Sequence, residues 1–260
     1  MKILFIGDVV GEPGRRAIQT LVPAMRRDLG LDWVIANGEN IAGGSGITIK
    51  TGSSLLDSGV DVITTGDHIW DQKESMGWIV QESRLLRPIN YPTEAPGHGS
   101  ILLEKNGFNR LAVINVQGRV FMQALENPFQ VMQKEVERLR AITPNILVDI
   151  HAEATSEKIA MARFLDGRVS GVIGTHTHVQ TADEQIFPGG TAFLCDAGFT
   201  GPQESVLGRQ IGPVIKRFLT CLPQRFPVAE GSIELQGAIV EIDNETGKAT
   251  KIERVRKRIP

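Results

Sequence analysis

Two histidines, His176 and His178, stand on either side of a single threonine, directly after the small and branched residues of "GVIGT". On an extended backbone, residues two apart point to the same side, so both imidazoles can reach one metal ion or two adjacent ions. The chain has five histidines in all, and two of them lie here. Such a pair also arises by chance, so its meaning depends on which other ligand residues join it.

Other side chains that can bind metals also follow apolar, strand-like runs. They are Asp8, Glu39, Asn40, Asp67, His68 and His151. The carboxyl ends of strands in an α/β sheet meet at one edge, where ligands bind, so we expect these side chains to converge on one crevice. Taken singly, each residue could have a structural role in place of metal binding. The aspartates could cap turns or helices, Glu39 could be a solvated loop acid, and His68 could be a surface histidine. A shared role explains the whole set better than several independent coincidences.

The ligand count predicts the kind of site. Asp8, Glu39, Asn40, Asp67, His151, His176 and His178 are too many for one tetrahedral zinc, and they suit two ions. Carboxylate, amide and imidazole donors without thiolate favour Mn, Fe, Zn or Ni over a purely oxygen-bound Ca or Mg site. Two metals about 3.5 to 4 Å apart recur in phosphoester hydrolysis, because the attacking and leaving oxygens both carry charge. Phosphoester cleavage is therefore the leading predicted chemistry.

The elements that must position these residues follow from the periodicity. Apolar, β-branched runs alternate with helical segments, which predicts an α/β chain with a β-rich tail. Helices are expected over residues 13–29, 50–58, 128–142 and 156–165, and a terminal hairpin over "GSIELQGAIVEID" and "KATKIERVRK". The segment "RPINYPTEAPGHGS", residues 87–100, is expected to be a long loop. From the pattern alone we predict one domain over 1–260, built on a single open sheet.

The bulk composition excludes several classes of protein. The chain has 260 residues, of which 41% are hydrophobic and 22% charged, which is ordinary for a globular protein. A net charge of −2 gives no field for holding a long nucleic acid. No apolar run is long enough for a membrane span, and the start is too soon interrupted for a signal peptide, so no membrane partner is expected. Two distant cysteines, Cys195 and Cys221, argue against a disulfide framework, which makes the cytoplasm the expected compartment.

The ordered motif D…E-N…G-N/D-H…H…G-x-H-x-H resembles the calcineurin-like metallophosphoesterase pattern. The surrounding segments "GDVVGEPGR", "GDHIWD", "GRVFM", "DIHAEATSEK", "GTHTHVQTAD" and "DAGFTGP" resemble its bacterial YmdB-like branch, and the likeness runs through nearly the whole chain. That branch comprises enzymes of the 2′,3′-cyclic-nucleotide 2′-phosphodiesterase type. The resemblance implies a calcineurin-like α/β sandwich, with two mixed β-sheets flanked by helices, in place of the single open sheet.

The resemblance also assigns roles. It implies one metal on Asp8, Glu39, Asn40 and His178, and a second on Glu39, Asp67, His151 and His176, with Glu39 bridging. His68 would face the substrate as the general acid for the leaving oxygen, and a hydroxide held between the ions would be the nucleophile. Iron is the metal expected first, with Mn and Zn as alternatives.

Two positions depart from the superfamily pattern. The first strand ends in Asp8-Val9-Val10 in place of D-x-H, and the resemblance to the YmdB-like branch implies that Asn40 fills the vacancy. Asp67 stands where the family usually has Asn. Three carboxylates, two divalent ions and one hydroxide sum to zero charge, so Asp67 is expected to bind its metal more tightly and make it a weaker Lewis acid, or to favour an Fe(III)/Fe(II) pair. Asp67 protonated or unbound is the alternative.

The predicted substrate is a small cyclic nucleotide, either 2′,3′-cyclic or 3′,5′-cAMP. Arg119, Thr175 and the backbone of "AGGSG" are candidates for phosphate binding, and Trp70 for stacking on a base; each has an equally ordinary structural alternative. Two other functions stay open. One is a broader phosphatase or nuclease, and the other is a regulatory metal-binding protein with little turnover. A homo-oligomer is also possible on these grounds.

Overall fold

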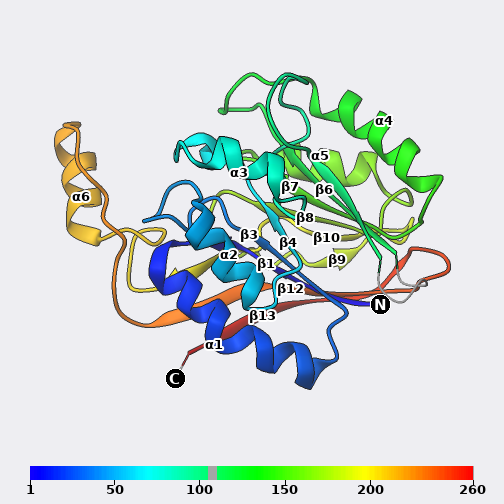
Figure 1. Ribbon diagram of the computed structural model, residues 1–260, viewed down its shortest axis with the longest axis horizontal. Coiled ribbons are helices and arrows are strands. Elements are labelled where there is room, and N and C mark those ends of the chain that lie inside the picture. The colour runs from blue at the N-terminus through cyan, green and yellow to red at the C-terminus, as the bar shows by residue number, and fades with distance from the viewer. Residues whose placement is uncertain (105–109, 260) are drawn as a thin grey trace.

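The computed structural model describes residues 1–104 and 110–259, which form two β-sheets packed face to face with helices on their outer sides (Figure 1). The strands of the first sheet are β1 (Lys2–Ile6), β2 (Asp8–Val9), β3 (Trp33–Asn37), β4 (Val62–Thr64), β11 (Phe199–Pro202), β12 (Ile233–Ile242) and β13 (Ala249–Arg258). Their order is β2-β11-β12-β1-β3-β4, with β13 also paired to β12. Because β1, β3 and β4 are parallel while β12 is antiparallel to β1, the sheet is mixed.

The second sheet is also mixed. Its strands are β5 (Ser100–Leu103), β6 (Leu111–Gln117), β7 (Ile146–His151), β8 (Gly171–Thr175), β9 (Gln185–Ile186) and β10 (Ala192–Leu194), in the order β5-β6-β7-β8-β10-β9. The four central strands β6, β7, β8 and β10 run parallel, and the two edge strands are antiparallel to their neighbours. The parallel strands of each sheet therefore bring their carboxyl ends to a common edge.

Strand periodicity explains how the two sheets share a core. In β1, Ile3 and Phe5 face the second sheet, whereas Leu4 and Ile6 face the helices. In β7, Leu147 lies in the layer between the sheets, while its neighbours along the strand pack on the outer helices. Successive side chains point to opposite faces, so strands that are covered on both sides are apolar throughout. The molecule thus has three hydrophobic clusters: one between the sheets and one under each helical layer.

The helices cover the outer faces. The first sheet is covered by α1 (Gly11–Leu29), α2 (Ile49–Asp57) and α3 (Ser75–Gln81), and the second by α4 (Pro128–Arg140) and α5 (Thr155–Phe164). Local signals set their starts. In α2, Thr48 and Thr51 form a reciprocal capping box, and in α4 the Asn127 side chain accepts from the Phe129 N–H with Pro128 at the first turn.

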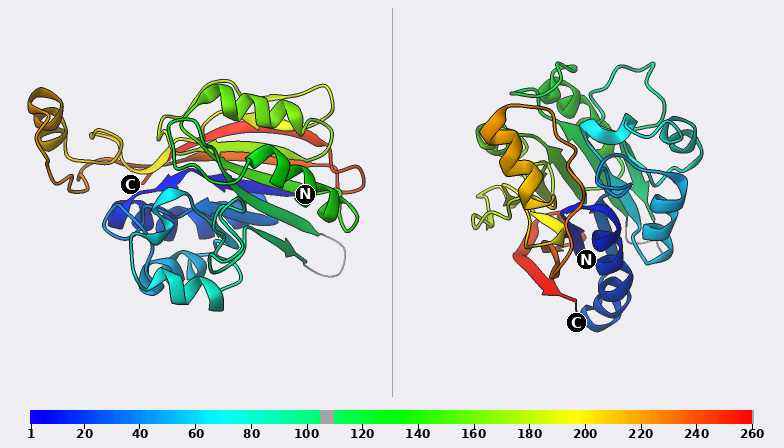
Figure 2. Two further views of the ribbon diagram at one scale, coloured as in Figure 1. Left: turned by 90° about the horizontal axis from the view of Figure 1, so that it is seen from above. Right: turned by 90° about the vertical axis from the view of Figure 1, so that its left-hand side faces the viewer.

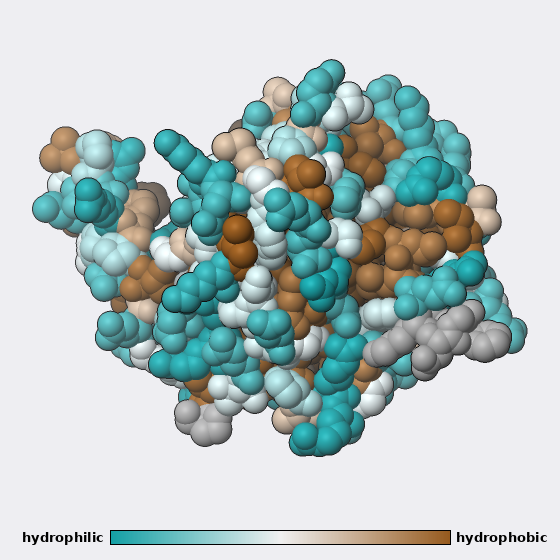
Figure 3. All heavy atoms as spheres, in the orientation of Figure 1, coloured by the Kyte–Doolittle hydropathy of each residue, from teal (hydrophilic) through white to brown (hydrophobic). Residues whose placement is uncertain are grey.

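One helix does not cover a sheet. α6 (Ile211–Thr220) stands away from the two-sheet body in Figure 1 and in the left-hand view of Figure 2, and the space-filling view shows the same separation (Figure 3). Only Val214 of this helix is buried, while Phe218 and Leu219 are each 80% exposed. We call residues 203–232, which leave the body after β11 and return to it at β12, the arm.

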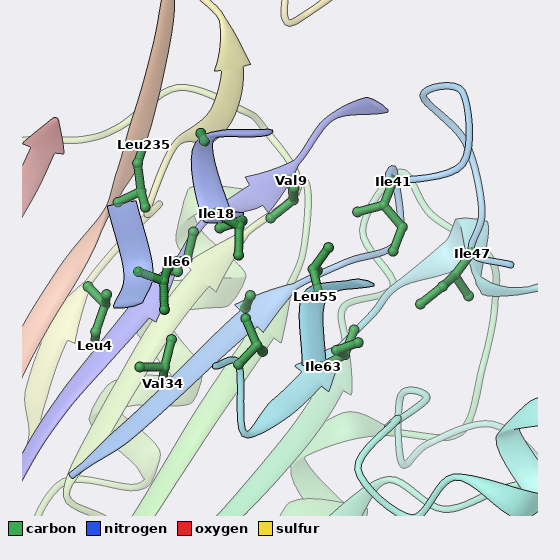
Figure 4. Close-up of a cluster of buried hydrophobic side chains, with 14 of the residues drawn as sticks. Leu4, Ile6, Val9, Ile18, Val34, Ile41, Ile47, Leu55, Ile63 and Leu235 are labelled. Carbon is green, nitrogen blue, oxygen red and sulfur yellow. The ribbon is translucent and has the colours of Figure 1, made fainter. Parts of the chain in front are cut away.

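The loop after β3 is held in place by two side chains that pack in the core. Ile41 and Ile47 are both fully buried, and Figure 4 shows them in the same cluster as Leu55 of α2 and Ile63 of β4. The segment "AGGSG" lies between these two anchors, where Gly43, Gly44 and Gly46 all adopt positive φ. The backbone next to Glu39 and Asn40 is therefore fixed by apolar packing.

Most predicted elements are confirmed. The four expected helices are present within two residues of their predicted ends, the terminal hairpin is β12–β13, and 87–99 contains no helix or strand. The prediction of a single open sheet from the pattern was wrong, and the two-sheet sandwich implied by the family resemblance is correct. The pattern missed α3, α6 and the 3-10 turn η1 (Asp67–Trp70). Among the described residues, no helix is long and apolar enough to cross a membrane.

Candidate metal centre

The layer between the sheets changes from apolar to polar at the carboxyl ends of the strands. Asn37 of β3 and Thr64 of β4 continue the inward face of the first sheet, and Asp149, His151 and Thr175 continue that of the second. All five are fully buried. They bond to one another: Thr64 and Thr175 both donate to Asp149, and the Asn37 amide lies 3.2 Å from Asp149 Oδ2. This network supports the ligand residues from beneath.

Four side chains converge directly above this network. Glu39, Asp67, His151 and His176 each offer a ligand atom within 4.8 Å of all the others, a grouping that could hold a metal ion. His151 Nε2 lies 3.3 Å from Glu39 Oε1 and 3.1 Å from Asp67 Oδ1. Gly66 makes this approach possible, since a Cβ there would lie 2.1 Å from the His151 ring. Residues at or just beyond the carboxyl ends of β3, β4, β7 and β8 thus meet at one point.

The hydrogen bonds on the two histidine rings favour a cation between them. Thr175 donates its hydroxyl proton to Asp149, so it accepts from His151 Nδ1–H at 2.9 Å. His176 Nε2 lies 3.2 Å from the carboxylate of Glu153, to which it donates. The remaining nitrogens, His151 Nε2 and His176 Nδ1, face each other at 3.0 Å. Lone pairs on both would repel at this distance, so a proton or a bound cation must lie between them.

A second group shares Glu39 with the first. The Asn40 side chain lies 3.1 Å from Glu39 Oε1 and 3.4 Å from His178 Nε2, which in turn lies 3.7 Å from Asp8 Oδ1. Asp8 Oδ1 is buried and has no hydrogen-bond partner. His178 Nδ1 donates to the carbonyl of Leu207, which leaves Nε2 free as a ligand. A buried carboxylate oxygen without a donor, aimed at a free imidazole nitrogen, fits a second cation.

The electrostatics of the metal-free cluster show the same need for positive charge. Burial raises the pKa of Asp8 to about 7, and the charge of Glu39 adds to the effect. For His151, burial opposes the charged form, but the carboxylates of Glu39 and Asp67 outweigh it and hold its pKa well above the usual value. For Asp67, burial is outweighed by the hydrogen bond and charge of His151, so its pKa is lowered and the side chain is ionised.

His68 sits at the mouth of the cluster. Its backbone N–H donates to Glu39 Oε2 at 3.3 Å, which fixes the turn η1, while its ring is not part of the four-residue group. The ring Nδ1 lies 2.8 Å from Asp71 Oδ2, and Ser45 bonds to both side chains. Asp71 therefore orients the His68 ring, and the sequence pattern gave no sign of that partner.

A cavity of about 430 Å³ opens over the cluster. Its polar wall includes Glu39, Asn40, His68, Glu153, His176 and His178. The apolar part of its lining comes from the arm, with Leu207, Val214, Phe218 and Phe226. Arg209 of the arm also lines it, and its guanidinium donates to the carbonyls of Gly44 and Phe226. The metal cluster thus faces a space with one charged and one hydrophobic side.

Comparisons with known proteins agree over the whole chain. A family model described as YmdB-like protein matches residues 4–255. A Bacillus subtilis protein named 2′,3′-cyclic-nucleotide 2′-phosphodiesterase is 49% identical over 255 residues, which covers 98% of this chain and 96% of that protein. A Mycoplasma genitalium protein named putative phosphatase/phosphodiesterase MG246 is 35% identical, covering 98% of this chain and 92% of its own.

This chain belongs to the YmdB-like family. Two solved structures share the fold of this YmdB-like chain. One is a hypothetical protein from Thermus thermophilus, with a TM-score of 0.94, 40% identity and full coverage of both chains. The other, described as a novel phosphatase from Mycoplasma pneumoniae, has a TM-score of 0.93 and 34% identity, covering 99% of this chain and 93% of its own. The calcineurin-like sandwich implied by the sequence motifs is thereby confirmed.

The structure places every predicted ligand residue of this YmdB-like chain in one region. Glu39, Asp67, His151 and His176 form the group that could hold an ion, and Asp8, Asn40 and His178 adjoin it. Both groups draw on the carboxyl edges of the two sheets, as the pattern predicts. Asp71, Glu153 and Arg209 were missed, because their contacts depend on loops and on the arm.

Of the other residues predicted to contact the substrate, three do not line the cavity and one segment borders it. Thr175 is fully buried and bonds to His151, so it cannot approach a phosphate. Arg119 is exposed and does not line the cavity, and its backbone N–H donates to Glu157. Trp70 packs edge-on against Tyr91 and is likewise outside the lining. The "AGGSG" loop does border the cavity region, but through the contact of its Gly44 carbonyl with Arg209.

Proposed function

We propose that this protein is a metal-dependent phosphodiesterase that hydrolyses small cyclic nucleotides, of the 2′,3′-cyclic type first and 3′,5′-cAMP second. The name of the Bacillus subtilis relative supports this substrate class. The observation that carries the proposal is the pair of ligand groups joined through Glu39, beneath a cavity that His68 also faces. A shared carboxylate between two cation sites is what phosphoester hydrolysis with two metals needs.

The residues fit two ions. One would be held by Asp8, Glu39, Asn40 and His178, and the other by Glu39, Asp67, His151 and His176. When bound, the ions supply Lewis acidity toward the phosphate oxygens and a nucleophile at neutral pH. Iron is the metal we propose first, with Mn and Zn as alternatives, because imidazole and carboxylate ligands suit all three. We further propose one domain over 1–260 and a cytoplasmic location; both cysteines are free thiols.

The protein side chains carry the proton transfer and the orientation. His68 holds a proton on the ring nitrogen that faces the cavity and gives it to the leaving ribose oxygen. Asp71, 2.8 Å from His68 Nδ1, fixes the ring in the orientation that this transfer requires. Glu153 similarly fixes the tautomer of His176 through Nε2, at 3.2 Å.

The apolar wall of the cavity would bind the base of the nucleotide. Phe218 and Phe226 line the same cavity as the metal cluster, and an aromatic ring stacks on any base. We expect Phe218→Ala to raise KM for 2′,3′-cAMP about 10-fold, because stacking on a base contributes roughly 1–3 kcal/mol. Steady-state kinetics would measure it, with ribose 2′,3′-cyclic phosphate as the matched substrate without a base. Equal effects on the two substrates would contradict base stacking. Leu219→Ala, on the same helix and equally exposed but outside the lining, is the control.

Asp67 allows a test of the metal pair. Its carboxylate oxygen lies 3.1 Å from His151 Nε2 and 3.6 Å from His176 Nδ1, inside the cluster. We expect Asp67→Asn to weaken metal binding about 10-fold or more and to shift the preference away from a trivalent ion, because one negative charge is lost. Elemental analysis and kcat under Fe, Mn and Zn would show it. If metal content, metal preference and kcat are all unchanged in Asp67→Asn, the negative charge of Asp67 has no role in metal binding.

Metal removal should also change stability. The buried carboxylates of the cluster repel one another without a cation, so bound ions stabilise the folded chain. An ion at about 100 times its Kd adds roughly 2.7 kcal/mol, and its removal should lower Tm by about 5 to 10 °C in a chain of this size. Thermal unfolding with EDTA, and with EDTA already saturated by Mn²⁺ as control, measures the difference. The same Tm in both would count against a resident ion.

The substrate assignment has a direct test. Metal-loaded protein is incubated with 2′,3′-cAMP, 3′,5′-cAMP, bis-p-nitrophenyl phosphate and p-nitrophenyl phosphate, and product release is followed. Fastest kcat/KM on 2′,3′-cAMP supports the proposal. Preference for p-nitrophenyl phosphate would indicate a broader phosphatase, and no release from any substrate under Fe, Mn and Zn would indicate a regulatory metal-binding protein. Gel filtration would settle whether the chain forms a homo-oligomer.

A further inference from the structure

A buried ion pair lies behind the two-histidine loop. Lys158 of α5 is fully buried, and its Nζ lies 2.7 Å from Oδ2 of Asp196, which is 1% exposed. The lysine stem passes close to Gly174, where a Cβ would lie 2.9 Å from Lys158 Cδ. Burying two charged groups costs desolvation free energy, so we ask which other groups this pair binds and positions.

Asp196 bonds to the residue between the two histidines. Its Oδ2 accepts from the backbone N–H of Thr177 at 3.1 Å and from the Thr177 hydroxyl at 2.7 Å. Its Oδ1 accepts from the Gly198 N–H at 2.8 Å. The two oxygens of a carboxylate can accept several hydrogen bonds, so Asp196 can take all these donors together with Lys158. Thr177 is therefore held through both its backbone and its side chain.

The loop that Thr177 anchors has an unfavourable backbone. His176 has φ of 95° and His178 has φ of 60°, both in the left-handed region that favours glycine. Glycine cannot replace either residue without loss of an imidazole. The conformation turns the His176 ring toward His151 and the His178 ring toward Asp8. An extended backbone would instead put both rings on one side.

We propose that Lys158 and Asp196 are positioning residues for the metal centre. Asp196 accepts two hydrogen bonds from Thr177. These bonds hold the neighbouring His176 and His178 in left-handed conformations, which direct one ring to each metal. Lys158, with its Nζ 2.7 Å from Oδ2, holds the buried carboxylate in place. This inference rests on the proposed function, because it takes both histidines as metal ligands. Neither positioning residue touches the substrate cavity.

Thr177 offers the mildest test. Thr177→Val removes the hydroxyl donor to Asp196 and keeps the size and the backbone N–H. Thr181→Val is the matched control, since the Thr181 hydroxyl bonds only to the backbone of Asp196, accepting from its N–H at 2.9 Å. Metal-free full-length chains are titrated with Mn²⁺ in competition with a chromophoric chelator. We expect Thr177→Val to weaken Mn²⁺ binding about 10-fold, within the range for supporting residues of metal sites.

Two further readouts separate positioning from general stability. The Tm of metal-free Thr177→Val should fall no more than that of Thr181→Val, and its kcat should recover toward wild type at saturating Mn²⁺. The double variant Lys158→Met, Asp196→Asn removes both charges together and avoids an unpaired buried ion. We expect it to bind Mn²⁺ more weakly than Thr177→Val, because an amide oxygen is a weaker acceptor for Thr177.

The outcomes are distinct. Wild-type affinity in Thr177→Val, equal loss in Thr181→Val, or wild-type affinity in the double variant would each overturn the positioning role. If the wild-type chain itself binds no Mn²⁺, the metal centre fails, and this inference fails with it. If the wild type binds Mn²⁺ but hydrolyses no cyclic nucleotide, the substrate proposal fails while the affinity comparison still decides the positioning role.

Discussion

Replacing Glu39 with glutamine is expected to lower kcat on 2′,3′-cAMP by about 10³-fold or more and to release at least one ion from the chain. Glu39 is 1% exposed, and its carboxylate lies 3.3 Å from His151 Nε2 and 3.1 Å from the Asn40 amide, so it belongs to both ligand groups. A loss of 10³-fold corresponds to about 4 kcal/mol of transition-state stabilisation. An amide in that place gives up the negative charge that two adjacent cations share.

Metal content per chain and kcat should therefore fall together in Glu39→Gln. The matched control is Glu157→Gln, which also removes a buried carboxylate, but one that accepts from the backbone N–H groups of Arg119 and Val120 outside the cavity. It should keep its metal and most of its rate even if its Tm drops. A Glu39→Gln chain that retains two ions and full activity would show that Glu39 does not join the two sites.

The convergence of the candidate ligand residues could be predicted from the sequence for a physical reason. Parallel strands place their carboxyl ends at one edge, so residues such as Asp67 and His151 that follow separate apolar runs meet without any need to know the register. Side-chain alternation adds the second condition. Leu147, Asp149 and His151 share one face of β7, and this face is the one that meets the other sheet.

The features that sequence patterns missed depend on contacts made by loops. Nothing local in "DHIWD" shows that Asp71 turns back onto His68, because that contact follows from the tight turn η1. The position of the arm was equally hidden. The apolar residues of α6 do follow helical spacing, at Ile211, Val214, Ile215, Phe218 and Leu219, but nothing in that pattern shows that the helix stands at the cavity, where Val214 and Phe218 line it. The two sheets were also beyond the pattern, since each strand is apolar on both faces whether one sheet or two are present.

His68→Ala is expected to lower kcat on 2′,3′-cAMP by about 10² to 10⁴-fold with no loss of metal, the range for removal of a general acid. His68 lines the cavity but is not a member of the four-residue cluster, so its loss leaves the ligand atoms in place. Asp71→Asn should cost less, because Asp71 only orients the ring. His98→Ala, in the 87–99 loop and outside this cavity, is the matched histidine control and should behave as wild type.

The leaving group separates proton donation from other roles of His68. A ribose alkoxide is a poor leaving group and must be protonated as it departs, whereas p-nitrophenolate is stable without a proton. We therefore expect His68→Ala to lose much less rate on bis-p-nitrophenyl phosphate than on 2′,3′-cAMP. Equal losses on the two substrates would mean that His68 acts by holding the phosphate, as a positive charge does. Since Asp71 would support a charged His68 in either role, only this difference between leaving groups decides where the proton goes.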